Sequence, residues 1–129
     1  MNLEYNELTE RIIGAAYEVH NILGSGFAEK VYHNAMMVEL SEIGITARAE
    51  YRADVYYKNR MVGEFYCDIM AEDVLLIEIK AVENFEKRHE VQLVNYLAAT
   101  GIDNGLLINF GSSVSVKRKF RKYTPKEKK

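Results

Sequence analysis

The sequence predicts an α+β fold in which helices pack against one mixed sheet of about five strands. Two amphipathic helical segments come first in the 129-residue chain, and three strand patterns follow with only short turns between them. A further helical segment then separates this group from two more strand patterns. Because strands joined by short turns pair antiparallel, we expect a three-stranded antiparallel meander within a sandwich that approaches an α/β arrangement.

The first two segments have the spacing of amphipathic helices. Over residues 3–23 the apolar side chains recur at steps of four and three, and the glycines that follow allow the chain to turn. A second helix is predicted over residues 28–43. It places Glu29 and Tyr32 on one face, because residues three apart are neighbours on a helix.

The middle of the chain alternates as strands do. Residues 47–57 switch between apolar and charged side chains, which is typical of a half-exposed strand. A second strand is predicted over 61–70 after a turn at 58–60, and a third over 74–80 after a turn at 71–73. The third strand is the most apolar of the three, so we expect it at the centre of the sheet.

A third helix is predicted over residues 85–100, with Asn84 as its N-cap and a glycine at its end. This helix leads to a strand at 105–110, which can lie parallel to the third strand because a helical crossover joins them, and a last strand follows at 114–120. One side of the helix carries a polar and aromatic stripe, made of His89, Gln92 and Tyr96.

We expect residues 1–123 to form a single domain and residues 124–129 to be a disordered basic tail. The net charge of −2 conceals an asymmetry, because the chain from Lys117 onward holds eight basic residues and one acid, which leaves about −9 on the rest. Such a body repels nucleic acid, so binding would need local basic patches or metal ions. The basic stretch at 117–123 is either such a patch or a solvated end that aids solubility.

The sequence also predicts a cytoplasmic protein with no membrane partner. No apolar run approaches the roughly 18 residues of a membrane span, and the first residues lack the pattern of a signal peptide. With Cys67 as the only cysteine, the chain cannot form an intrachain disulfide, a cysteine-rich zinc site or a cysteine-ligated iron–sulfur cluster.

Charged residues interrupt the apolar run at 74–80. Glu78 and Lys80 lie on one face of this predicted strand, and Asp68 can stand across from Glu78 on the preceding strand. Charges in so apolar a strand are costly to desolvate unless they have partners or a task. Two carboxylates beside a lysine are what a hard divalent cation and a phosphate require, whereas the alternative is a surface ion pair.

The order of these residues resembles the PD-(D/E)XK nuclease superfamily: an acid on one strand, Glu-x-Lys on the next and a helix that carries a glutamine. The matching residues are Asp68, Glu78, Lys80 and Gln92, and Glu29 lies where many members have a further acid. The spacing of Gly26, Glu29 and Tyr32 is similar to the motif of the GxxExxY proteins within this superfamily, and Gln92 with Tyr96 is similar to the QxxxY element of RecB-like exonucleases. Cys67 stands where the superfamily often has proline.

The resemblance implies a restriction-endonuclease-like core and a metal-dependent nuclease that hydrolyses DNA or RNA. Asp68, Glu78 and the backbone carbonyl of Ile79 would bind Mg²⁺ or Mn²⁺, and Glu29 would orient a water or bind a second ion. Lys80 would position the attacking water or stabilise developing charge, and Gln92 would orient Lys80 or a phosphate. Contacts with the substrate are expected from Tyr32, Tyr96 and His89.

Other interpretations remain open at this stage. Glu29 is also a favourable helix N-terminal acid, the two tyrosines are also typical core aromatics, and His89 is also a simple exposed helix residue. The whole chain can also be a nucleic-acid-binding module without catalytic activity, or a protein-interaction module whose apolar faces pair two copies. A small domain that grips a duplex often works as a homodimer.

Overall fold

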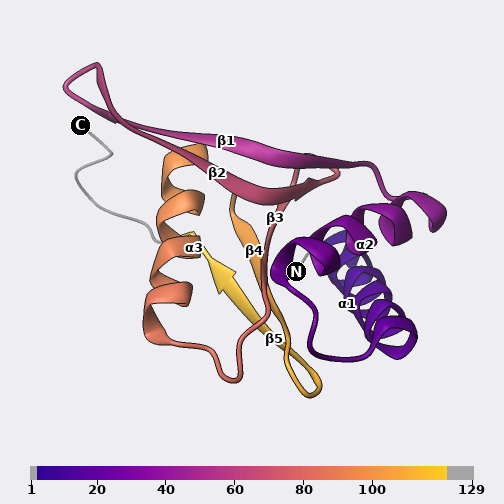
Figure 1. The fold of residues 1–129 in the computed structure, drawn as a ribbon. Helices are drawn as coiled ribbons and strands as arrows, with labels where there is room; N and C mark the ends of the chain where they lie inside the picture. Colours follow the sequence, from indigo (N-terminus) through magenta and orange to yellow (C-terminus); the bar gives the residue numbers. More distant parts are fainter. Residues whose placement is uncertain (1–2, 122–129) are drawn as a thin grey trace.

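The computed structural model describes residues 3–121, and this part of the chain forms three helices and five strands (Figure 1). In chain order the elements are α1 (Leu3–Leu23), α2 (Glu29–Glu42), β1 (Ala47–Tyr57), β2 (Arg60–Ala71), β3 (Leu75–Lys80), α3 (Lys87–Thr100), β4 (Asn104–Phe110) and β5 (Val114–Phe120). The sequence predicted these elements in this order. The predicted tail at 124–129 lies outside the described residues.

The five strands form one mixed sheet in the order β1-β2-β3-β4-β5. The first three strands are an antiparallel meander, β3 and β4 are parallel, and β5 returns antiparallel to β4. The predicted meander, the parallel crossover through α3 and the central position of β3 are therefore confirmed.

Helices cover both faces of the sheet, with α1 and α2 on one face and α3 on the other (Figure 1). Ile77 and Ile79 of β3 belong to the core under α1 and α2. Leu76 points the opposite way and packs in a second cluster with Leu93 and Leu97 of α3. Because side chains alternate along a strand, Glu78 and Lys80 share the α3 side with Leu76. No helix in the described part of the chain is long and apolar enough to cross a membrane.

The alternation predicted for β1 is interrupted at Glu50. This residue has a φ of 56°, and the ladder steps from Ala49↔Ile69 to Tyr51↔Cys67, so that Glu50 is unpaired. Left-handed backbone is unusual for a residue other than glycine, and it turns the side chain away from the direction that a regular strand would give it. Half-exposure of the strand was correctly predicted, but only Ala53 of β1 is buried.

Beyond Ala53 the β1–β2 hairpin extends past α3 as an arm (Figure 1). Its turn uses Lys58 and Asn59, both with positive φ, which gives the backbone twist favoured in two-residue hairpins. The arm exposes several large apolar side chains, namely Val55, Tyr56, Tyr57, Met61, Val62, Phe65 and Tyr66.

The helix α3 begins later than predicted, at Lys87, and its N-cap is Glu86 rather than Asn84. The Glu86 side chain accepts the His89 backbone N–H, and the His89 ring accepts the Glu86 backbone N–H at 3.1 Å. This reciprocal pair satisfies two N–H groups at the helix start, so it outweighs the local N-cap preference of asparagine. The predicted end at Gly101 is confirmed, with a left-handed φ of 77°.

Candidate functional site

The backbones of β2 and β3 separate beside Asp68 and Glu78. Their ladder ends at Ile69↔Ile77, after which the side chains take over the hydrogen bonding. The Asp68 backbone N–H donates to Glu78 Oε1 at 2.8 Å, and the Ile79 backbone N–H donates to Asp68 Oδ2 at 2.7 Å. Figure 1 shows β3 running away from β2 at this point. The structure therefore places the two predicted carboxylates side by side in a fork between the strands, which we call the fork site.

Burial makes ionisation of this pair unfavourable. Glu78 is 4% exposed, and burial followed by the neighbouring Asp68 carboxylate raises its pKa to about 7. Burial also raises the pKa of Asp68, against the lowering effects of the Ile79 N–H, His33 and Lys80. Two adjacent carboxylates that resist ionisation, one buried and one partly buried, gain most from a bound cation, because a cation favours the charged form of both.

Lys80 is the last residue of β3 and is partly buried. Its ammonium lowers the pKa of both Asp68 and Glu78, so it lies within electrostatic range of the fork site. Lys80 forms no ion pair with any of residues 3–121. The alternative of a surface ion pair between Glu78 and Lys80 is therefore not observed, and the ammonium keeps its hydrogen-bonding capacity for another partner.

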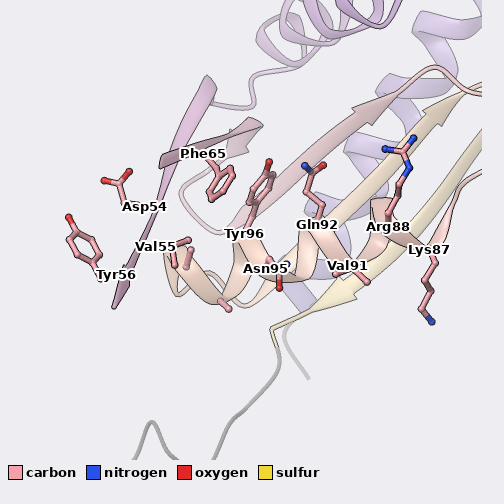
Figure 2. A pocket seen from close by; sticks show the side chains of 12 residues that line it. Asp54, Val55, Tyr56, Phe65, Lys87, Arg88, Val91, Gln92, Asn95 and Tyr96 are labelled. Atoms are coloured by element: carbon pink, nitrogen blue, oxygen red, sulfur yellow. The ribbon is translucent and has the colours of Figure 1, made fainter. Parts of the chain in front are cut away.

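Two side chains of α3 face a cavity beside the fork site. Gln92 and Tyr96 both line this cavity of about 990 Å³, which lies between α3 and the β1–β2 hairpin (Figure 2). Burial and the nearby Glu78 carboxylate raise the pKa of Tyr96 to about 12, so its hydroxyl stays protonated at neutral pH. Gln92 is exposed and makes no hydrogen bond to Lys80 or to any other described residue, so its predicted role depends on a ligand.

His89 is not the exposed helix residue that its position in the sequence allowed, because it is only 4% exposed. Its Nδ1 accepts the Glu86 backbone N–H, which leaves the proton of the neutral ring on Nε2. Burial and the charge of Lys80 lower the pKa of His89, so the ring is neutral at physiological pH. His89 is thus a fixed donor close to Lys80.

Glu29 stands apart from the two carboxylates. It is the first residue of α2, it is exposed, and it makes no hydrogen bond or ion pair with the described residues. Its charge raises the pKa of His89, so the Glu29 carboxylate lies within electrostatic range of that ring. Within residues 3–121 no group of three or more histidine, cysteine or acidic side chains can hold a metal ion, and Glu29 therefore does not join Asp68 and Glu78 in a three-carboxylate cluster.

Tyr32 occupies the core rather than a substrate-facing position. The residue is fully buried, and its ring stacks on Phe110 at 4.6 Å between centroids. Its hydroxyl donates to the Gly24 carbonyl at 2.7 Å and accepts the Phe27 backbone N–H at 3.3 Å. The alternative of a core aromatic with a satisfied hydroxyl therefore describes Tyr32, which fixes the loop between α1 and α2.

Replacement of Tyr32 by phenylalanine tests this structural position. We expect Tyr32→Phe to lower the free energy of unfolding by about 1 kcal/mol, because a loop carbonyl and a loop N–H lose their partner. Urea unfolding with Tyr17→Phe as control measures the change, since Tyr17 is half exposed on α1. Equal midpoints for the two variants would contradict the position described here.

The structure adds residues that the sequence did not identify. The His33 Nε2–H donates to the backbone carbonyl of Asp68 at 3.0 Å, which ties α2 to the fork site. Asn109 is fully buried in β4 opposite Lys80, and its side chain bonds both the N–H and the carbonyl of Val82. Glu50 raises the pKa of Asp68, so its irregular backbone brings a further acid near the fork site. A polar residue inside an apolar run was a usable signal for Asn109, as it was for Glu78.

The donor set of the fork site fits a divalent cation. Asp68 and Glu78 each use one oxygen to accept a backbone N–H, and the bond from Ile79 keeps that residue beside the carboxylates. Mg²⁺ is typically held by one or two carboxylates together with waters and substrate phosphates, and it does not require a complete protein cage. Two hard oxygen ligands without a third acid are consistent with that mode of binding.

Two solved structures are similar in fold to this chain. The crystal structure of SSO0001 is similar to this chain with a TM-score of 0.57 and 14% identity, over 77% of this chain and 53% of that one, so this chain spans about half the length of SSO0001. An alkaline exonuclease from Laribacter hongkongensis, LHK-Exo, is similar with a TM-score of 0.50 and 12% identity, over 88% and 82% of the two chains.

At these identities the likeness establishes a shared nuclease-type fold, and the expected restriction-endonuclease-like core is confirmed. No curated protein matches the sequence. The sequence model of the PD-(D/E)XK nuclease superfamily matches residues 6–123, which include every residue of the fork site. The chain therefore belongs to the PD-(D/E)XK nuclease superfamily.

Proposed function

We propose that this protein is a metal-dependent nuclease that hydrolyses phosphodiester bonds of DNA or RNA at the fork site. One observation carries the proposal: the carboxylates of Asp68 and Glu78 each accept a backbone N–H from the other strand, which holds them together although both resist ionisation. Such an arrangement costs stability unless a task offsets it. Membership of a nuclease superfamily makes nucleic acid the natural substrate class.

The proposed roles follow from position. A divalent ion at Asp68 and Glu78 supplies charge neutralisation on the phosphate and activation of water. Asp68, Glu78 and the Ile79 carbonyl hold that ion, and PD-(D/E)XK nucleases generally use divalent metals, here Mg²⁺ or Mn²⁺. Lys80 positions the attacking water or stabilises the charge that develops on the phosphate.

The remaining predicted residues act around this centre. Gln92 and Tyr96 orient the substrate from α3, where the protonated Tyr96 hydroxyl is a donor. His89 offers a neutral Nε2–H toward a phosphate oxygen. In this proposal Glu29 acts from the rim and orients a water, because it lies outside the pair of carboxylates.

We also propose the finer family assignment and the domain limits. Gly26, Glu29 and Tyr32 support placement among the GxxExxY proteins, with Tyr32 in a structural role. Gln92 and Tyr96 support a RecB-like QxxxY element, because both line the same cavity. Residues 1–123 would form one nuclease domain.

Cleavage of labelled oligonucleotides tests the proposed activity. Single- and double-stranded DNA and RNA are incubated with the protein and either Mn²⁺, Mg²⁺ or a chelator. We expect cleavage of at least one of these substrates with metal and none with chelator, because Lys80 alone cannot neutralise the phosphate charge. Cleavage at an equal rate in chelator would contradict a metal-dependent mechanism.

A binding module without catalytic activity is the second candidate. It is favoured by the position of Glu29, since the described residues place only two carboxylates together. This candidate predicts salt-dependent binding of nucleic acid that a chelator does not change, with no turnover under any metal condition.

A further inference from the structure

The cavity between α3 and the β1–β2 hairpin, which we call the hairpin groove, is lined by side chains of β1, β2 and α3. Tyr96 lines the groove on α3, and Phe65 on the opposite wall is three residues before Asp68 on β2, so the groove lies near the fork site although neither carboxylate lines it. Figure 2 shows Phe65 of β2 facing Tyr96, with Gln92 and Arg88 next along α3. A strand that leaves the groove past Phe65 and follows β2 would come to the fork site.

The groove has aromatic walls that remain partly uncovered. Phe65 is 46% exposed and its ring lies 6.1 Å from that of Tyr96, while Tyr56 at the far end is 63% exposed. Aromatic faces stack on nucleobases of any sequence, because every base has a π-face. In a duplex these faces are already covered by the neighbouring base pairs, so rings set inside a groove can stack only on bases that have left a duplex.

The charges along the groove also fit one strand better than two. Lys87 and Arg88 lie at one end, at the start of α3, where the helix dipole favours an anion. Arg88 is paired with Glu86, and Lys87 has no ion-pair partner among the described residues. This small basic region is set in a chain that is acidic before its basic end. A single strand condenses fewer counterions per phosphate than a duplex, so an acidic body repels it less.

The size of the groove agrees with this ligand. Its volume of about 990 Å³ is at the upper end of the range of clefts that hold small ligands, which leaves room for a few nucleotides in an extended strand. We propose that the hairpin groove binds single-stranded nucleic acid, with bases stacked on Phe65 and Tyr56 and phosphates near Lys87, and delivers it to the fork site. This inference rests on the proposed nuclease function and specifies its substrate class.

Fluorescence anisotropy tests the groove separately from catalysis. A labelled single strand of about 12 nucleotides, as DNA and as RNA, and the matching duplex are titrated with the protein in Ca²⁺. We expect the wild-type protein to bind the single strand more tightly than the duplex. The variant Phe65→Ala should bind the single strand about 5- to 100-fold more weakly, which is the range for loss of one stacked base.

Two variants guard against a folding artefact. Tyr17→Ala removes an aromatic of similar exposure from α1, on the opposite face of the sheet, and it should bind as the wild type does. Phe65→Trp keeps a stacking surface and should retain the wild-type affinity. Thermal unfolding of each variant establishes that it is folded.

The outcomes separate the groove from the nuclease. Equal affinity for single strand and duplex, or unchanged affinity in Phe65→Ala, would contradict single-strand binding in the groove, even if metal-dependent cleavage is observed. Binding of the single strand that depends on Phe65, together with no cleavage in Mg²⁺ or Mn²⁺, would support the groove and count against the proposed catalysis. If the protein binds no nucleic acid, the proposed role of the groove is wrong. If it also cleaves none, the proposed nuclease function is wrong too.

Discussion

Asp68→Asn and Glu78→Gln are each expected to lower the rate of metal-dependent cleavage by about 100- to 1,000-fold. Both substitutions keep the size of the side chain and an oxygen that accepts the backbone N–H across the fork. What they remove is the negative charge that attracts a divalent ion. Initial rates on the best substrate from the cleavage assay, measured at saturating Mn²⁺, give the change.

The matched control for this pair is Glu83→Gln. Glu83 is an exposed acid in the loop that follows β3. Its substitution by glutamine removes the same negative charge as the two test variants do, but outside the fork site. We expect its rate to stay within a factor of about two of the wild type, because exposed charges contribute little. Cleavage that persists in Asp68→Asn and Glu78→Gln would assign the activity to a contaminant or to other residues.

The second large effect is on stability as a function of pH. Without metal, the protein should lose up to about 3 kcal/mol of stability as the pH rises from about 4.5 to above 7. The pKa of Glu78 is raised to about 7 in the folded state by burial and by Asp68. Between these pH values the folded protein therefore binds more protons than the unfolded chain. The contribution of Glu78 to stability is fully present below the pKa that Glu78 has in the unfolded chain. It is lost as the pH rises through the higher pKa that Glu78 has in the folded protein.

Comparison with Glu78→Gln isolates this contribution. Urea unfolding of the two proteins between pH 5 and 8, in the presence of a chelator, should show a smaller decrease for the variant. His89, whose pKa burial lowers, acts in the opposite direction but is present in both proteins. Parallel pH profiles of the two proteins would contradict a buried, protonated Glu78. Added Mn²⁺ should stabilise the wild type more at pH 8 than at pH 5.5, because the ion binds the ionised carboxylates.

The fold was predictable because its elements follow clear periodicities. Three residues, Glu72 to Val74, separate the paired residues Ala71 and Leu75, so the turn lies one residue later than the predicted turn at 71–73. The observed register places Asp68 across from Glu78. The sequence placed Asp68 and Glu78 on one face of the sheet through the alternation of side chains along adjacent strands, whereas their exact pairing depended on the position of the turn.

The surrounding residues were harder to predict because their positions depend on how the helices pack. His33 reaches the Asp68 carbonyl only because α2 packs with the His33 side of the helix against the sheet. The same rotation buries Tyr32 and leaves Glu29 exposed, although a helical wheel places Glu29 and Tyr32 together. His89 is held in place by its reciprocal hydrogen bonds with Glu86. The usual capping box pairs serine or threonine with glutamate or glutamine, so the sequence did not suggest this pairing of glutamate with histidine.

Diffraction from crystals soaked in Mn²⁺, collected at a wavelength where manganese scatters anomalously, tests the central claim most directly. We expect an anomalous peak between the carboxylates of Asp68 and Glu78, about 2.0–2.2 Å from an oxygen of each, with waters completing the coordination. A peak elsewhere in the molecule, with no peak at Asp68 and Glu78, would contradict the fork site as a metal centre.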